Sequence, residues 1–354
     1  MKKTEKHTTF ICTWVDDLLI VSNDPNIHEL RTELERDQFE ISHFAPISKY
    51  LGAQVEYNRT KNTLKITQKE YIETLLHKYG MTESKPVKTP MNESDKPSKH
   101  DKPTEKRKCI DTETDTKKRR EMLAELKEEI EQMKRTPYRG VIGSLSHLTR
   151  MTRPEIQFAT FYHARYQNDP GRKHWISAKR MLRYLVGTKD IALVANRNAP
   201  LIEIYTDSDY MGDPDEAKST TGIVIKVYGI PVLVKSRLQT LNAKSTTQAE
   251  IIAMCDTAEE AIWITNLLIE LGEHPKPIMQ ADNQPSISTI ENTKINRGNK
   301  HIANKYYFVK GYVQNKDLTI KYIPSKENIA DICTKPLPRP AFEYLRSKLY
   351  HQHI

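Results

Sequence analysis

The chain has 354 residues, of which 37% are hydrophobic, so it can bury a sizeable core and is expected to form two or three domains. No apolar run reaches the roughly 18–20 residues that a membrane-spanning helix needs, and residues 1–6 are not followed by the apolar segment of a signal peptide. The four cysteines lack C-x-x-C spacing, which argues against a disulfide framework and a zinc site. We therefore expect a soluble intracellular protein without a membrane partner.

The positive charge is unevenly distributed along the chain. The net charge is +9 overall, and residues 137–200 alone carry +8. Residues 1–91 have no net charge, residues 92–136 carry +1 and residues 201–338 carry −2. A concentrated basic surface is typical of phosphate binding, with a solvated helical face as the alternative. The pattern thus favours a nucleic-acid partner for residues 137–200.

The first elements predicted are strands. Residues 8–22 form an apolar, β-rich run that is interrupted by Asp16 and Asp17, which indicates a hairpin with its tip at these aspartates. The elements expected next are a helix over 25–39, two strands within 50–67 and a helix over 68–79.

A charged segment with few apolar residues follows at 92–136. Its first half, 95–117, lacks periodicity and predicts a disordered or mobile linker. Its second half, 118–134, has apolar residues at helical spacing and predicts a solvated helix. Within the basic segment 137–200, residues 138–188 then show a helical pattern typical of a small bundle.

After residue 200 the periodicity changes to an α/β order with a mixed sheet. Strands are expected at 201–206, 222–227, 232–235, 278–281 and 318–323, and helices at 246–271, from Asn283, at 304–315 and from about Glu327.

Four carboxylates occur where these strands end or helices begin. Asp207 ends the first strand, Glu250 lies one turn into the long helix, Asp282 ends the fourth strand and Asp331 follows the fifth. Any one of them alone is more often a cap or a surface charge. Four converging carboxylates would repel one another without cations, and hard oxygen ligands suit Mg²⁺ or Mn²⁺. Two such ions about 3.5–4 Å apart stabilise the attacking and leaving oxygens of a phosphodiester displacement.

Six strings within 201–338 carry a family resemblance. They are YTDSDYMGD (205–213), KSTTG (218–222), STTQAEIIA (245–253), ADNQPSI (281–287), NKHI (299–302) and ENIADICTKPLP (327–338). This segment resembles the ribonuclease H domain of copia-type LTR retrotransposon polyproteins. The resemblance implies a ribonuclease H-like five-stranded mixed sheet with helices, and a site for two Mg²⁺ ions, for which Mn²⁺ can substitute.

The resemblance also assigns roles at this site. It implies that Asp207 bridges both ions, that Glu250 and Asp282 complete the ion on the leaving-group side, and that Asp331 holds the ion that activates water. His301 is a candidate auxiliary residue for substrate binding or product release, with a packed or surface histidine as the alternative. Cellular ribonucleases H often carry a histidine before the last aspartate, whereas residues 324–328 contain none.

The resemblance continues upstream. Trp14-Val15-Asp16-Asp17 resembles the aromatic-x-Asp-Asp hairpin of reverse transcriptases, and KYLG (49–52), YRGVIG (138–143), TRPEI (152–156) and LRYLVGT (182–188) resemble segments that follow it. The implied domains are a partial palm with the start of the thumb (1–91), a charged insert (92–136), a basic helical thumb and connection (137–200), the ribonuclease H domain (201–338) and a C-terminal helix or tail (339–354). The basic helices would then contact the hybrid backbone through Arg150, Arg153, Lys179, Arg180 and Arg183.

Two departures limit the polymerase assignment. The hairpin carries Trp14 where the family usually has tyrosine. A polymerase also needs a further aspartate on an earlier palm strand and the fingers, which leaves Asp16 and Asp17 as a residual polymerase metal site. We therefore expect no DNA synthesis by this chain alone, and the missing N-terminal Pol portion is a candidate partner.

Three functions remain open at this point. The first is a truncated reverse transcriptase/ribonuclease H that cuts the RNA strand of RNA–DNA hybrids. The second is an inactive remnant that binds nucleic acid without cutting it. The third is a fragment of a full Pol polyprotein with RNA-directed DNA polymerase activity. The expected location is the cytoplasm, in virus-like particles if the element is active, with the nucleus as the alternative.

Overall fold

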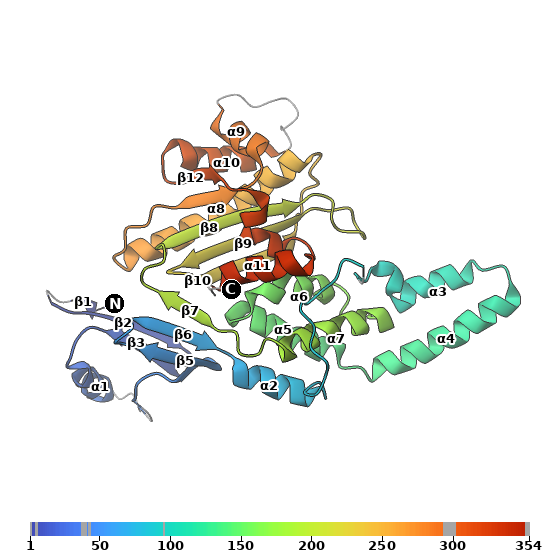
Figure 1. The fold of residues 1–354 in the computed structure, drawn as a ribbon, viewed down its shortest axis with the longest axis horizontal. Coiled ribbons are helices and arrows are strands. Elements are labelled where there is room, and N and C mark those ends of the chain that lie inside the picture. The colour runs from blue at the N-terminus through green and yellow to red at the C-terminus, as the bar shows by residue number, and fades with distance from the viewer. Residues whose placement is uncertain are drawn as a thin grey trace.

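The computed structural model describes residues 2–3, 6–36, 41, 44–94, 96–292 and 302–350 (Figure 1). Their strands form one three-stranded, one four-stranded and one five-stranded sheet. Within these ranges, no helix is both long and apolar enough to span a bilayer.

The N-terminal sheet confirms the predicted hairpin. It has the order β1-β2-β3, with β1 at Lys2–Lys3, β2 at Thr8–Trp14 and β3 at Asp17–Ser22. Trp14 pairs with Asp17, and Val15 at the tip has a φ of 51°. Helix α1 (Ile27–Arg36) follows the hairpin.

The four-stranded sheet joins two segments that are distant in the sequence. β4 (Lys49–Tyr50), β5 (Ala53–Asn58) and β6 (Thr63–Thr67) are followed in the sheet by β7 (Leu193–Asn196), which pairs antiparallel with β6. β7 lies beyond residues 138–188, for which the sequence predicts helices, and the sequence did not predict this strand. A four-residue strand that depends on a partner more than a hundred residues away leaves little local pattern.

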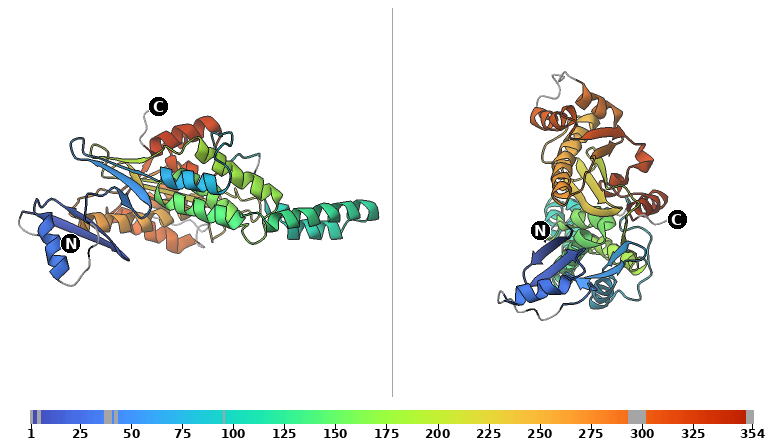
Figure 2. Two further views of the ribbon diagram at one scale, coloured as in Figure 1. Left: turned by 90° about the horizontal axis from the view of Figure 1, so that it is seen from below. Right: turned by 90° about the vertical axis from the view of Figure 1, so that its left-hand side faces the viewer.

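The charged insert is folded. It contains η1 (Lys99–Asp101), α3 (Pro103–Asp111) and α4 (Thr116–Lys134), so the prediction that 95–117 are disordered is wrong for the described residues. The Asp115 carboxylate caps α4 by accepting the amides of Lys117 and Lys118. Ile110 and Leu126 are buried between the two helices, which project from the body as a hairpin (Figures 1 and 2).

A helical core lies beside the five-stranded sheet. Its elements are α2 (Lys69–Lys78), α5 (Tyr138–Met151), η2 (Pro154–Ile156), α6 (Gln157–Ala164), α7 (Arg172–Val186) and α11 (Arg339–Leu349). Phe342 and Leu345 of α11 share one buried cluster with Leu145 and Leu182. The C-terminal segment is thus a packed helix that closes this core.

The five-stranded sheet confirms the predicted mixed α/β architecture. Its order is β10-β9-β8-β11-β12, in which β8, β9 and β10 are antiparallel and β11 is parallel to both β8 and β12. The strands are β8 (Ile202–Asp209), β9 (Thr220–Val227), β10 (Ile230–Leu238), β11 (Ile278–Ala281) and β12 (Thr319–Tyr322).

Three helices pack on this sheet around a second core. They are α8 (Thr246–Glu270), α9 (Gln284–Glu291) and α10 (Ala303–Gln314). Ile204 and Ile225 of the sheet meet Ile251 of α8 and Tyr306 of α10 in one buried cluster. This packing fixes α8 against β8.

The helix expected from Glu327 is replaced by two short 3₁₀ turns, η4 (Ser325–Glu327) and η5 (Ile329–Cys333). Asn328 explains the change, because its Nδ2 donates to the carbonyl of Thr206 at 2.9 Å and its Oδ1 accepts the amide of Ala330. A Cβ on Gly222 of β9 would lie 2.7 Å from the carbonyl oxygen of Ala330. The turn therefore lies directly on the sheet.

Buried His163 on α6 predicts a pH-dependent stability. Its Nδ1 donates to the carbonyl of Ala159 at 2.7 Å, and its Nε2 is buried without a partner among the described residues. Burial lowers the pKa of His163 to about 4. A folded-state pKa below the unfolded value of roughly 6.5 means that stability is complete above that pH and is lost as pH falls toward 4. Between pH 7 and pH 5 we expect a loss of about 2 kcal/mol from this residue.

The measurement is the melting temperature of the wild type and His163→Gln at both pH values. The variant should be less stable at pH 7 but lose less on acidification. An equal fall in both proteins would contradict the assignment.

Candidate metal centre at the edge of the five-stranded sheet

Three of the predicted carboxylates converge. Asp207, Glu250 and Asp282 each offer an oxygen, and these oxygens all lie within 4.8 Å of one another. Asp207 is on β8 and Asp282 follows the parallel strand β11, whose residues Met279 and Gln280 pair with Ile204 and Tyr205. Continuing this register by two residues sets Asp282 beside Asp207, so the pairing of the two strands builds half of the site.

Helix α8 supplies the third carboxylate. Ser245 caps the helix by accepting the amide of Gln248, and Oε1 of Gln248 accepts the amide of Lys244 at 2.8 Å. Thr257, two turns beyond Glu250, donates to Thr206 of β8 at 2.8 Å. The cap fixes where the helix begins, and the Thr257 contact fixes its position along β8, so Glu250 faces Asp207.

The site holds buried negative charge. Asp207 is 3% exposed and Glu250 is 6% exposed. Burial, followed by repulsion from Asp331, raises the pKa of Asp207 well above its ordinary value. Burial, followed by repulsion from Asp207 and Asp282, does the same to the pKa of Glu250.

The donor set fits a hard divalent cation. All three ligands are carboxylate oxygens, which Mg²⁺ and Mn²⁺ prefer. Oε2 of Glu250 is buried and has no hydrogen-bond partner within the described residues. A cation would satisfy this oxygen and neutralise the cluster.

Asp331 lies beside the cluster but not among its three converging oxygens. It is on η5, close enough to raise the pKa of Asp207, and it forms an ion pair of 2.8 Å with Lys335. Burial alone would lower the pKa of Lys335, but Asp207 and Asp331 raise it above its ordinary value. Thr334 donates to Oδ2 of Asp207 at 2.6 Å.

Sequence reasoning missed the roles of Thr334 and Lys335, although both stand in the string ENIADICTKPLP. That string could have identified them, since a basic and a hydroxyl residue within four positions of a site aspartate are natural candidates for its neighbours.

Comparison with known proteins places the chain in a family. Residues 1–93 match the family described as reverse transcriptase (RNA-dependent DNA polymerase). The chain is 34% identical over 342 residues to the retrovirus-related Pol polyprotein from transposon TNT 1-94 of Nicotiana tabacum, covering 96% of this chain and 24% of that protein. It is 31% identical over 344 residues to the Pol polyprotein from transposon RE2 of Arabidopsis thaliana, covering 96% and 22%.

The chain belongs to the copia-type retrotransposon Pol polyproteins. It spans about a quarter of the length of these relatives. The strand order, strand directions and packing of α8 give residues 201–338 a ribonuclease H-like fold. Among solved structures, LC11-RNase H1, isolated from compost by a metagenomic approach, is 18% identical with a TM-score of 0.31, covering 42% of this chain and all of that one.

The two hairpin aspartates form no metal cluster of their own. Asp16 and Asp17 are exposed at the tip between β2 and β3. Within the described ranges, the only group of three or more potential ligands that converge is the one at Asp207. The assignment of Asp16 and Asp17 as a residual polymerase site stays a prediction.

Arg153 does not contact solvent, so its predicted role in binding nucleic acid is wrong. Its side chain is fully buried and donates to Glu155 at 2.8 and 2.6 Å and to Thr188 at 2.7 Å. Glu155 also accepts the hydroxyls of Tyr184 and Tyr350. A buried ion pair and an exposed one have the same residue types in sequence, which is why the pattern did not separate them.

The other basic residues predicted to contact nucleic acid differ in how far their side chains are exposed and engaged. Arg150 is exposed, and Lys179 is partly exposed with its ammonium 5.7 Å from the Trp175 ring. Arg180 donates to Thr89 and Asn92, and Arg183 donates to the carbonyl of Lys85. Arg180 and Arg183 therefore tie α7 to residues 85–92. His301, the candidate auxiliary residue, lies outside the described residues.

Because the cluster gathers acidic groups, we expect Asp207→Asn to have opposite effects on the stability of the fold with and without metal. Because the folded state raises the pKa of Asp207 well above that of the unfolded chain, its ionisation destabilises the fold at pH 7. Asp207→Asn should therefore raise the unfolding free energy of the metal-free chain. Added Mg²⁺ should stabilise the wild type and not the variant.

Thermal melts with EDTA and with Mg²⁺ measure both effects. Asp317→Asn is the control, since it makes the same charge change at an exposed residue of the same domain. Equal stabilisation by Mg²⁺ in all three proteins would contradict binding at this cluster.

Proposed function

We propose that this chain hydrolyses the RNA strand of RNA–DNA hybrids at the Asp207 cluster, with two Mg²⁺ ions, for which Mn²⁺ can substitute. The observation that carries the proposal is the convergence of Asp207, Glu250 and Asp282 within 4.8 Å on a ribonuclease H-like sheet. Similarity to Pol polyproteins along 96% of the chain supports it.

Each residue has a distinct task in this proposal. Asp207, Glu250 and Asp282 hold cations, with Asp331 as a fourth ligand. When bound, the two ions supply stabilisation for the attacking and leaving oxygens of the phosphodiester. Thr334 orients the Asp207 carboxylate, and Lys335 fixes Asp331 while reducing the repulsion between the two aspartates.

Catalysis is expected to require this cluster. Asp207→Asn should reduce cleavage of a labelled RNA–DNA hybrid by at least about a hundredfold, because even the loss of groups that only orient metal ligands costs 10–100-fold. Asp317→Asn should cleave as the wild type does. The assay uses the purified chain with Mg²⁺ and, separately, Mn²⁺.

No cleavage by the wild type, together with salt-sensitive binding of the hybrid, would favour the second function, an inactive nucleic-acid-binding remnant. The observation behind this alternative is the net charge of +8 over residues 137–200, which does not depend on an active centre.

We also propose that exposed cations of the helical core contact the nucleic-acid backbone. Arg150 is the foremost candidate, and Lys179 is the next, because Arg180 and Arg183 bond groups of the chain itself. Such contacts position a duplex without selecting its sequence.

The salt dependence of hybrid binding tests this assignment. Arg150→Gln should lower the slope of log K against log salt by about one, equally for hybrids of different sequence. Lys117→Gln, at the exposed start of α4, should leave the slope unchanged. A slope that is the same for wild type and Arg150→Gln would remove Arg150 from the interface.

DNA polymerisation is proposed to require a further Pol portion. The palm hairpin presents large apolar side chains to solvent, among them Trp14 at 61% and Val15 at 82% exposure. A surface of this kind is suited to packing against another protein segment.

A further inference from the structure

The loop that leads from the metal centre to the next strand is held in place by hydrogen bonds and an ion pair. β8 carries Asp207 and ends at Asp209, and residues 210–219 lead into β9. Within this loop, the buried Asp213 accepts the amide of Glu216 at 3.0 Å, and its own amide donates to the carbonyl of Lys218. The Asp213 carboxylate also forms an ion pair of 2.7 Å with Arg165, the residue that follows α6. Contacts from outside the sheet therefore hold the loop.

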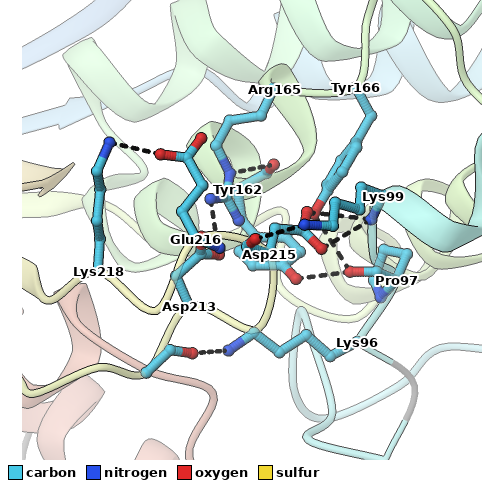
Figure 3. A network of polar contacts seen from close by, with 11 residues as sticks. Lys96, Pro97, Lys99, Tyr162, Arg165, Tyr166, Asp213, Asp215, Glu216 and Lys218 are labelled. Carbon is cyan, nitrogen blue, oxygen red and sulfur yellow. Dashed lines mark hydrogen bonds and ion pairs between the residues drawn. The ribbon is translucent and has the colours of Figure 1, made fainter.

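Residues 96–99 of the charged insert, here called the strap, bind the same loop (Figure 3). Nζ of Lys96 donates to the carbonyl of Gly212 at 2.8 Å. The amide of Lys99 donates to both carboxylate oxygens of Asp215, at 2.8 and 3.0 Å, and its Nζ donates to the Asp215 carbonyl at 2.7 Å. The strap thus holds the loop at two separate points.

Helix α6 and Tyr166, which follows it, join the strap and the loop in one polar network, here called the junction. The hydroxyl of Tyr166 donates to Oδ2 of Asp215 at 2.7 Å, and that of Tyr162 donates to the carbonyl of Pro97 at 2.5 Å. The ammonium of Lys96 lies 5.2 Å from the centre of the Tyr162 ring. Strap, loop and helix converge on these groups in Figure 3. The junction joins the insert, the helical core and the nuclease sheet.

The junction reaches the metal centre through Asp209. Asp207 and Asp209 are two residues apart on β8, so their side chains lie on the same face of the sheet. A Cβ on Gly212 would lie 1.7 Å from Oδ2 of Asp209, so the backbone that Lys96 holds packs directly on this carboxylate.

We propose that Lys96 of the strap and Asp215 of the loop are positioning residues for hybrid cleavage. They hold residues 210–219 and, through Gly212, the position of Asp209 and the end of β8. The catalytic consequence rests on the proposed function, whereas the structural one does not. The charged insert then has a role in the nuclease: its strap keeps the metal-binding strand in its working geometry.

A substrate contact by Lys96 would produce a different pattern. Its ammonium is already engaged by the Gly212 carbonyl and the Tyr162 ring. A positioning role lowers kcat and leaves hybrid affinity unchanged, whereas a phosphate contact weakens affinity and lowers its salt dependence.

Hydrogen exchange tests the structural part on the full chain. Lys96→Ala/Asp215→Ala keeps the net charge, and Lys117→Ala/Asp317→Ala is a matched control that removes one exposed lysine and one exposed aspartate elsewhere. Amides of 210–219 should exchange about tenfold faster in the first variant, since one lost hydrogen bond to a charged group changes local opening by roughly that factor. The control should exchange as the wild type does. Unchanged exchange in the first variant would overturn the proposal.

Hybrid cleavage with Mg²⁺ tests the catalytic part. The first variant should lose about tenfold in kcat with an unchanged Kd for the hybrid, since small misplacements of reacting groups cost up to about a hundredfold. Lys96→Arg, which keeps the donor, should recover most of the rate of Lys96→Ala. A weaker Kd with unchanged kcat would overturn the positioning role. If the wild type does not cut, the proposed function fails, and the exchange measurement alone decides whether the strap holds the loop.

Discussion

Burial of like charges at one edge of a sheet is the constraint on which this structure depends. Asp207 and Glu250 are almost inaccessible to water, and with Asp282 they bring three carboxylates within 4.8 Å. Such an arrangement is costly in a low-dielectric environment unless cations neutralise it. The surrounding groups are arranged accordingly: Thr334 donates to Asp207, and Lys335 pairs with Asp331 on the adjacent turn. The fold therefore holds an acidic cluster that could bind a metal ion.

The helical core packs against the five-stranded sheet whose edge carries these carboxylates. A buried ion pair between Arg153 and Glu155 is completed by hydroxyl donors from α7 and from Tyr350 at the end of α11. Removing one member of such a pair leaves an uncompensated buried charge, so its members are tightly interdependent. Because the C-terminal segment enters this network, it is part of the core that adjoins the five-stranded sheet.

The charged insert has two physically different parts. The α3–α4 hairpin projects from the body and is stabilised mainly by contacts between its own helices (Figure 1). The strap before it is bound to α6 and to residues 210–219 by charged and aromatic groups. The strap, which is polar in sequence, is thus ordered by specific polar and aromatic partners.

The sequence by itself determined the N-terminal hairpin, the mixed five-stranded sheet and the three carboxylates Asp207, Glu250 and Asp282, because periodicity and strand-end positions are local properties. Tertiary structure alone decided the strand β7, the order of the insert and the burial of Arg153. Each of these depends on a partner that packing supplies: a distant strand, a helix face or a buried counter-charge. An arginine or a charged linker has the same composition whether it meets water or a buried partner, and only the three-dimensional arrangement distinguishes the two.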